Sequence, residues 1–224
     1  MAGSEADPAT ARDVVFGRIR AALGDGLPSV AIPRDYERVL AAGTDVLDLF
    51  VERVSDYRAT VHRTTERGLR DTVATVLASR GATRIAVPAG LPDAWLAASR
   101  AEWVSDDPPL VYDDLDRLDG VITGCAIAIA ETGTIVLDAM PGQGRRALSL
   151  LPDLHVCVVL AGQVVGTVPE AIDRLDPTRP QTWISGPSAT SDIELQRVEG
   201  VHGPRTLDVI LVDELAARAQ VQGD

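Results

Sequence analysis

Most of the side chains that could do chemistry lie in three short polar segments in the second half of the chain. The first is Glu131-Thr132-Gly133-Thr134, which follows an apolar run. A carboxylate beside a glycine and two hydroxyls can act as a nucleophile, a base or an acceptor that orients a substrate. The same four residues are also typical of a hairpin turn in which Glu131 is only solvated. Spacing alone leaves both interpretations open.

The second segment is Gly142-Gln143-Gly144-Arg145-Arg146, which leads into apolar residues up to position 151. We predict a glycine-rich loop that opens a helix, because backbone N–H groups at a helix start attract anions. Two guanidinium groups would match a carboxylate or a phosphate. The pattern therefore predicts a site for a small carboxylate or phosphate ligand. The alternative is a solvated arginine pair that forms ion pairs with nearby acidic residues.

The third segment covers residues 185–192 and is followed by a second polar stretch at 200–205. Its site residues are Ser185, Gly186, Ser188, Thr190, Ser191 and Asp192, and the later stretch adds His202 and Gly203. Four hydroxyls and a carboxylate form a dense hydrogen-bonding surface. His202 could shuttle a proton or bind an anion. The alternatives are that Ser191 or Asp192 caps a short helix and that His202 bonds to the backbone.

Residue types that are missing or rare exclude several classes of enzyme. All 21 basic residues are arginines, so the chain has no lysine for a Schiff base, a pyridoxal anchor or a phosphate loop. No Gly-x-Ser-x-Gly elbow is present, which makes a serine hydrolase a poor match. Cys125 and Cys157 are too few for a four-thiolate iron–sulfur cluster, and the histidines show no ligand spacing. We therefore expect no metal site in this chain.

The charge balance restricts the possible partners. With 33 acidic and 21 basic residues the net charge is −12, which opposes binding to nucleic acid and to anionic membranes. No apolar run reaches the roughly 18 residues of a spanning helix, and the first residues do not form a signal-peptide pattern. We expect a soluble, cytoplasmic protein without membrane insertion.

The elements that must position the polar segments alternate between helical and strand patterns, which is typical of an α/β sheet. Predicted helices cover residues 13–23, 44–56, 65–80 and 168–175, with Thr44, Thr65 and Thr167 as N-caps. Predicted strands cover residues 57–62, 85–87, 121–130, 135–137, 154–160, 182–184 and 207–212. We expect residues 1–43 to form a tail with a helical extension and residues 44–224 to form a single α/β domain.

Two long strings in the second half resemble a known family. AETGTIVLDAMPGQGRRALSLLPDLHVCVVLAGQVVGTVPEAIDRL and WISGPSATSDIELQRVEGVHGPRTLDVILV are similar to the LUD-domain family, and within it to the lactate utilization protein C group. The resemblance implies a three-layer α/β/α fold like that of glucosamine-phosphate isomerase, ribose-phosphate isomerase and CoA transferases. It also implies a role in oxidising L-lactate to pyruvate with two partner proteins that carry iron–sulfur clusters. No catalytic residues are carried over from the family.

Three functions are compatible with these observations. The first is an accessory or substrate-binding subunit, in which Arg145 or Arg146 holds a carboxylate and Glu131, Ser188 or His202 faces the reacting end. The second is a stand-alone enzyme of the CoA-transferase or sugar-phosphate-isomerase type, with Glu131 as the nucleophile. The third is a structural domain that works by binding partner proteins.

Overall fold

The computed structural model describes residues 8–24, 31–190, 198–199 and 203–213. The chain divides into two compact units, residues 1–36 and residues 37–224. The predicted division after residue 43 remains a prediction. At the start of the second unit, Arg38 forms an ion pair with Asp173 of the α/β body, with Nη2 2.8 Å from Oδ2.

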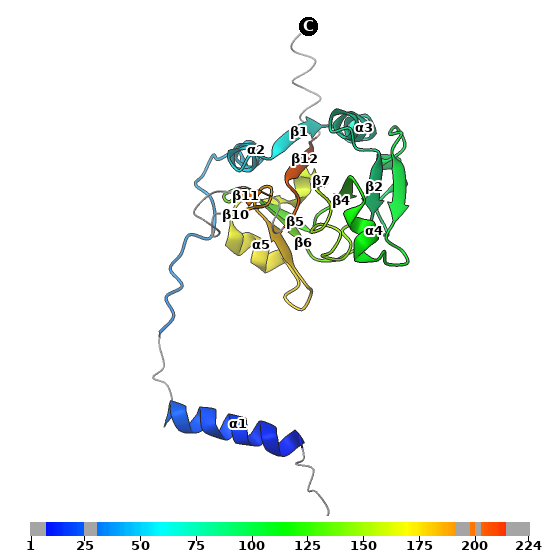
Figure 1. The fold of residues 1–224 in the computed structure, drawn as a ribbon. Helices are drawn as coiled ribbons and strands as arrows, with labels where there is room; N and C mark the ends of the chain where they lie inside the picture. The colour runs from blue at the N-terminus through cyan, green and yellow to red at the C-terminus, as the bar shows by residue number, and fades with distance from the viewer. Residues whose placement is uncertain (1–7, 25–30, 191–197, 200–202, 214–224) are drawn as a thin grey trace, which may run out of the picture. The chain divides into compact units, whose positions relative to one another are not determined.

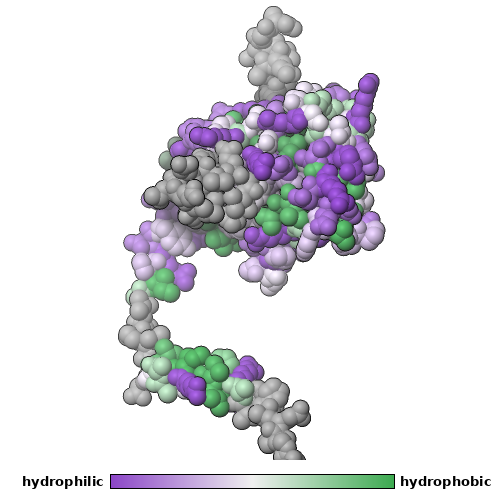
Figure 2. Space-filling model, viewed as in Figure 1, coloured by the Kyte–Doolittle hydropathy of each residue, from purple (hydrophilic) through white to green (hydrophobic). Residues whose placement is uncertain are grey.

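The first unit contains helix α1 (Pro8–Leu23), which begins at Pro8 rather than at the predicted residue 13. Its apolar side chains are 42–54% exposed, namely Val14, Val15, Phe16, Ile19 and Leu23. Figure 2 shows them as an apolar surface along the helix. None of the described helices combines the length and apolar composition needed to cross a bilayer.

The second unit is built on a six-stranded parallel sheet in the order β1-β12-β7-β4-β2-β3. Its strands are β1 (Thr60–Thr64), β2 (Arg84–Val87), β3 (Glu102–Ser105), β4 (Gly120–Thr123), β7 (Leu154–Leu160) and β12 (Thr206–Val212). The central strands β7 and β12 pair along their whole length, from Leu154 opposite Thr206 to Leu160 opposite Val212. Both faces of a parallel sheet are buried, which explains their nearly continuous apolar runs.

Alternate side chains of the central strands enter two different cores. Val156, Val158 and Ile210 pack with helix α3 (Leu69–Ser79) on one face. Cys157, Val159 and Val209 pack on the other face, together with helix α2 (Val46–Asp56) and a second sheet. The period of two that separates these sets is the geometry of an extended strand.

The second sheet has four strands in the order β8-β5-β6-β9. They are β5 (Ile127–Ile129), β6 (Thr134–Leu137), β8 (Val164–Val165) and β9 (Thr182–Ile184). Its outer face packs against helix α5 (Val168–Arg174), so that α3 and α5 lie on opposite sides of the two sheets (Figure 1). The predicted hairpin around Glu131 is confirmed by the antiparallel pairing of β5 with β6.

Two predictions about strands and caps need correction. The predicted strand 121–130 is two strands in different sheets, because β4 ends at Thr123 and β5 begins at Ile127. The N-cap of α2 is Asp45 rather than Thr44, and its carboxylate accepts hydrogen bonds from the N–H groups of Leu47 and Asp48. The predicted cap of α5 is confirmed: Thr167 and the Glu170 side chain form a capping box.

The remaining elements are short. They are the 3₁₀ turns η1 (Asp93–Trp95) and η2 (Ala161–Gln163), helix α4 (Tyr112–Asp116) and the antiparallel pair β10 (Ala189–Thr190) and β11 (Val198–Glu199). Helix α3 starts at Leu69, four residues after the predicted start at 65, and its N-cap is Gly68 rather than the predicted Thr65. The turn between Thr65 and Gly68 accounts for the difference, because the Gly68 N–H donates to the carbonyl and the hydroxyl of Thr65.

Candidate functional site

A cavity of about 270 Å³ lies where the two sheets meet the polar segments. Four stretches of chain line it: part of the turn after Arg146, the start of β7, residues 182–188, and residues 203–207. The polar side chains on its wall are those of Arg146, Ser149, His155, Thr182, Ser185 and Ser188. The cavity therefore collects one cation, one imidazole and several hydroxyls from segments far apart in the sequence.

Arg146 supplies the positive charge of this cavity. Its side chain is exposed and forms no ion pair with any described residue. It also lines an adjoining cavity of about 930 Å³, to which Arg80, Arg117 and Arg205 contribute. A guanidinium that is not neutralised by the protein is available for a carboxylate or phosphate, which it can hold by two parallel hydrogen bonds.

His155 lies at the second position of β7 and is only 1% exposed. Its Nε2 is 2.8 Å from the hydroxyl of Thr123, whereas its buried Nδ1 has no hydrogen-bond partner among the described residues. Burial lowers the pKa of His155 to about 4, so the ring is neutral at neutral pH. An unpaired buried polar atom costs about 1–3 kcal/mol, so this Nδ1 lowers the stability of the fold.

A chain of hydroxyls links the first polar segment to the third. Thr132 Oγ1 is 2.7 Å from Thr134 Oγ1, which is in turn 2.7 Å from Ser185 Oγ on the cavity wall. Thr134 is buried in β6 and Ser185 follows β9, so the antiparallel pairing of these strands brings the hydroxyls together. The structure thus brings hydroxyls of the first and third polar segments together at Thr134, whereas Glu131 is not part of this chain of hydroxyls.

Arg145 is directed away from this cavity. Its Nε and Nη2 donate to the two carboxylate oxygens of Asp106 at 2.8 and 2.9 Å, and its guanidinium lies 5.8 Å from the centre of the Tyr112 ring. Burial alone would raise the pKa of Asp106, but hydrogen bonds from Arg145 and from the Leu110 N–H lower it below its usual value. Arg145 therefore forms the local ion pair that the sequence left open as an alternative. Of the two adjacent arginines, only Arg146 is available for a ligand.

The residues before Arg145 hold the loop in place. Gly142 donates its N–H to the Ala89 carbonyl and accepts from the Gly124 N–H, both at 2.8 Å. Gln143 is buried and its Oε1 accepts from the Asp138 N–H. Gly144 has a φ of +72°, and a Cβ there would lie 2.4 Å from Leu148 Cδ1. These contacts join the carboxyl ends of β2 and β4.

The predicted helix after this loop is wrong. Residues 146–150 form successive turns, in which the Leu148 N–H donates to the Arg145 carbonyl and the Leu151 N–H to the Ala147 carbonyl. Without a helix there is no helix start to attract an anion at Gly144. Any anion affinity of this segment rests on the Arg146 side chain.

Glu131 lies in the β5–β6 turn, is exposed, and is not among the residues that line the 270 Å³ cavity. Its N–H donates to the Gly166 carbonyl at 3.0 Å. Gly133 in the same turn has a φ of +58°, and a Cβ there would lie 2.7 Å from the Arg53 carbonyl carbon in α2. Gly133 is therefore explained by the close packing of this turn against α2, as expected for a structural turn.

The third segment contributes to the cavity through its first residues. Ser188 donates its N–H to the Pro204 carbonyl at 2.8 Å, and this bond holds Gly203 beside it. Gly186 packs on Tyr57, where a Cβ would lie 2.5 Å from the Tyr57 Cβ. The backbone of Thr190 pairs with Val198. The predicted site residues Ser191, Asp192 and His202 lie outside the described residues.

Sequence reasoning missed His155, Thr123 and Ser149. A signal for His155 exists in the sequence, because it is the only polar side chain in the strand LHVCVVL. Such a residue must either find partners inside the core or border a cavity. Its partner Thr123 lies on a different strand, so no short motif contains both residues.

The described residues contain no group of three His, Cys, Asp or Glu side chains placed to hold a metal ion. Cys125 and Cys157 are both buried and are not joined by a disulfide. The pKa of Cys125 is raised well above its usual value, first by its hydrogen bond with Cys157 and then by burial. The Cys125 thiol is therefore a neutral group of the core.

Comparison with known proteins assigns the chain to a family. The model of the LUD domain matches residues 47–212. The chain belongs to the LUD-domain family. It is 47% identical over 192 residues to lactate utilization protein C of Deinococcus radiodurans, an alignment that covers 84% of this chain and 87% of that protein. It is 33% identical to lactate utilization protein C of Bacillus subtilis over 121 residues, or 50% of each chain.

A solved structure also matches this chain. The crystal structure of a DUF162 family protein from Deinococcus radiodurans superimposes with a TM-score of 0.66 at 44% sequence identity. The match covers 75% of this chain and 96% of that one. Almost the whole of that solved chain thus has a counterpart in this protein.

Proposed function

We propose that this LUD-domain protein takes part in lactate utilization by binding a small carboxylate, L-lactate or pyruvate, in the 270 Å³ cavity. The observation that carries the proposal is Arg146, a guanidinium on the cavity wall without an ion-pair partner among the described residues. A cavity of this size suits a ligand of a few heavy atoms. The relatives named lactate utilization protein C support lactate as the chemistry.

The proposed role is that of a subunit rather than a complete oxidase. Oxidation of lactate to pyruvate removes two electrons, and the family resemblance implies partner proteins with iron–sulfur clusters that would accept them. This chain has two cysteines, fewer than the four thiolates of such a cluster. We place the complex in the cytoplasm, where reduced thiols such as Cys125 and Cys157 persist.

We also propose the finer relationship of the fold to glucosamine-phosphate isomerase, ribose-phosphate isomerase and CoA transferases. The six-stranded parallel sheet with α3 on one face supports it. Kinship of this kind does not carry a reaction with it. A CoA-transferase reaction through Glu131 gains no support from the geometry, since Glu131 stands in an exposed turn away from the cavity.

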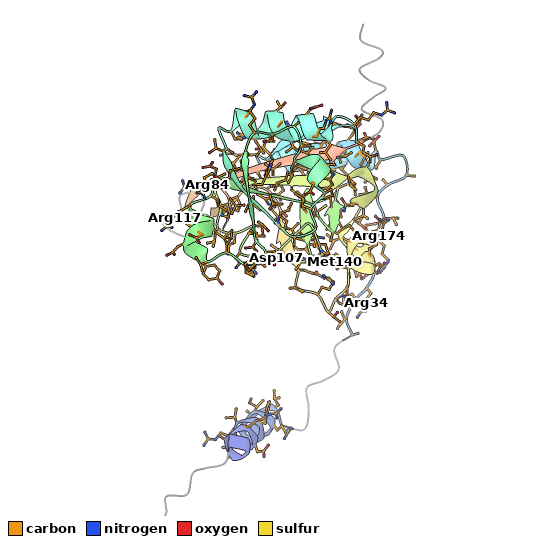
Figure 3. The ribbon with its side chains drawn as sticks, turned by 90° about the vertical axis from the view of Figure 1, so that its right-hand side faces the viewer. Arg34, Arg84, Asp107, Arg117, Met140 and Arg174 are labelled. Carbon is orange, nitrogen blue, oxygen red and sulfur yellow. The ribbon has the colours of Figure 1, made fainter. Side chains whose placement is uncertain are left out.

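The test of the carboxylate site is calorimetric titration of L-lactate and pyruvate into wild-type protein and Arg146→Ala. Loss of a charged hydrogen-bond donor costs about 2 kcal/mol, so we expect roughly 30-fold weaker binding. The matched control is Arg174→Ala, which removes the same charge from α5. Figure 3 shows Arg174 on the side of this unit opposite Arg117, which lines the adjoining cavity.

Two results would contradict the proposal. One is the absence of heat and of a thermal shift with either acid in the wild type, and the other is equal weakening by Arg146→Ala and Arg174→Ala. The subunit role has a separate test, which is co-purification with iron–sulfur proteins of the kind that the family resemblance implies. If the protein does not associate with these iron–sulfur proteins under reducing conditions, the subunit role is wrong and only the carboxylate site stands.

A further inference from the structure

A hydroxyl on the wall of the 270 Å³ cavity ends a chain of three hydrogen-bonded hydroxyls. Ser185 follows β9, is exposed, and lines the cavity. Its Oγ is 2.7 Å from Oγ1 of Thr134, which is buried in β6 and is itself 2.7 Å from Thr132 Oγ1. Thr132 is half-buried in the β5–β6 turn, so the chain runs from the cavity through the core to the turn.

The hydrogen bonds of this chain can point in either direction. Each hydroxyl has one hydrogen and two lone pairs, so all three can donate toward the turn or all three toward the cavity. In the first arrangement Ser185 donates to Thr134, and the Thr134 hydrogen goes to Thr132 Oγ1 or to the Thr132 carbonyl, 3.4 Å away. In the second arrangement Thr132 donates to Thr134, and Thr134 donates to Ser185. Rotation of the three hydroxyl groups converts one arrangement into the other.

The two arrangements present opposite groups to the cavity. When Ser185 donates to Thr134, its oxygen offers the cavity a lone pair that accepts a hydrogen. When Ser185 accepts from Thr134, its own hydrogen is left to donate into the cavity. Ser185 therefore matches either a donor or an acceptor at the same place on a ligand, without any movement of the backbone.

We infer that Ser185 is the residue of the proposed carboxylate site that recognises the C2 oxygen of a 2-hydroxy or 2-oxo acid. It accepts from the hydroxyl of L-lactate and donates to the keto oxygen of pyruvate, while Arg146 holds the carboxylate. The inference rests on the proposed function and names how the two acids are recognised within it. The cavity then holds the reduced and the oxidised acid with similar affinity, and it binds an acid without a C2 oxygen less tightly.

The test is a thermodynamic cycle between three acids and two forms of the protein. Calorimetry measures the affinities of L-lactate, pyruvate and propionate, all ionised at pH 7, in the full-length wild type and in Ser185→Ala. In the wild type we expect L-lactate and pyruvate to bind about equally and about fivefold more tightly than propionate, the effect of one hydrogen bond. In Ser185→Ala the three acids should bind alike. A substitution that only distorts the cavity would weaken propionate as well, so propionate separates recognition from a structural effect.

Three further variants define the source of the preference. Ser185→Thr keeps the hydroxyl and should keep the preference over propionate. Thr134→Val removes the hydroxyl that holds Ser185, so it should weaken L-lactate and pyruvate by the same factor. Ser55→Ala is the matched control, because the Ser55 hydroxyl donates to the Val51 carbonyl in α2 and lies outside the cavity. It should leave all three affinities unchanged.

The outcomes separate this inference from the function on which it rests. If no acid binds the wild type, the proposed carboxylate site is wrong and the inference falls with it. If Arg146→Ala weakens all three acids but the wild type shows no preference over propionate, the carboxylate site stands and the role of Ser185 is overturned. A preference that persists in Ser185→Ala would overturn that role too. A strong preference of the wild type for one of L-lactate and pyruvate, or a loss confined to one of them in Thr134→Val, would overturn the reversal of the hydroxyl chain.

Discussion

Arg145 and Arg146 are neighbours in sequence, yet they serve two regions with different physical demands. In the loop region, Gly142 to Arg145, backbone hydrogen bonds join the ends of β2 and β4. The one charged side chain of this region, Arg145, forms an ion pair with the buried Asp106 carboxylate. The cavity region, from Arg146 to His155, leaves a cation and a buried imidazole nitrogen without partners among the described residues. Paired groups stabilise a fold, whereas an exposed cation at a cavity, such as Arg146, is available for a ligand.

The two regions should respond to acid in different pH ranges, and this is the largest effect we expect. Burial lowers the pKa of His155 from 6.5 to about 4. Between these values the unfolded chain binds a proton that the folded chain does not, so stability is complete above pH 6.5 and falls toward pH 4. The loss is about 3 kcal/mol, measured by urea denaturation at successive pH values.

The Asp106 contribution should be lost at lower pH. Its pKa is already lowered from 3.8, since hydrogen bonds from Arg145 and Leu110 outweigh the effect of burial. That part of the stability is present above pH 3.8 and declines below it. His155→Gln should remove the slope between pH 6.5 and 4, whereas Arg145→Ala should keep it. The same slope in both variants would remove the distinction between the regions.

Arg145→Ala should lower the free energy of unfolding by about 2–3 kcal/mol, because the buried Asp106 carboxylate loses its paired donor. The guanidinium is 31% exposed, so we expect less than for a fully buried pair. Urea denaturation at pH 7 measures the change, and Arg174→Ala should stay within about 0.5 kcal/mol. If Arg145→Ala keeps its stability but no longer binds L-lactate, then Arg145 contacts the ligand and the structural assignment is wrong.

Gly144→Ala should cost about 2 kcal/mol, which corresponds to a decrease in Tm of roughly 4–8 °C for a chain of this size. The backbone φ is +72°, and the added Cβ would lie 2.4 Å from Leu148 Cδ1 and 2.9 Å from Pro88 Cβ. Gly162→Ala is the control, since a Cβ there meets nothing within 4 Å. Equal melting temperatures for the two variants would show that the loop does not need its glycine.

Glu131→Gln should have the smallest effect. The side chain is exposed and lies outside the cavity, so stability and L-lactate affinity should each change by less than about 0.5 kcal/mol. Thermal melting and calorimetry in parallel measure both. A loss of catalytic turnover at unchanged stability would instead favour the CoA-transferase hypothesis and move the reaction centre to the β5–β6 turn.

Local patterns predicted much of the architecture. The predicted strand 154–160 coincides with β7, and the predicted cap Thr167 is the N-cap of α5. These features depend on residues a few positions apart. The break between β4 and β5 was not readable, because an apolar run does not reveal that its halves belong to two sheets.

The candidate site was predicted only in part for the same reason. Arg146, Ser185, Ser188 and Gly203 were all singled out by type and setting, and the structure brings them to one cavity. His155 was not among the predicted site residues. Its partner Thr123 is 32 positions away, on the parallel strand β4 that pairs with β7.

The sequence by itself determined the family, the alternation of helices and strands, the excess of acid and the types of side chain available for chemistry. Those properties follow from composition and from short-range periodicity, which act along the chain. Only the tertiary structure decided which of two adjacent arginines is neutralised and which histidine has a nitrogen left over. Both depend on burial and on partners from distant strands, since a charge or an acceptor is free only in relation to everything folded around it.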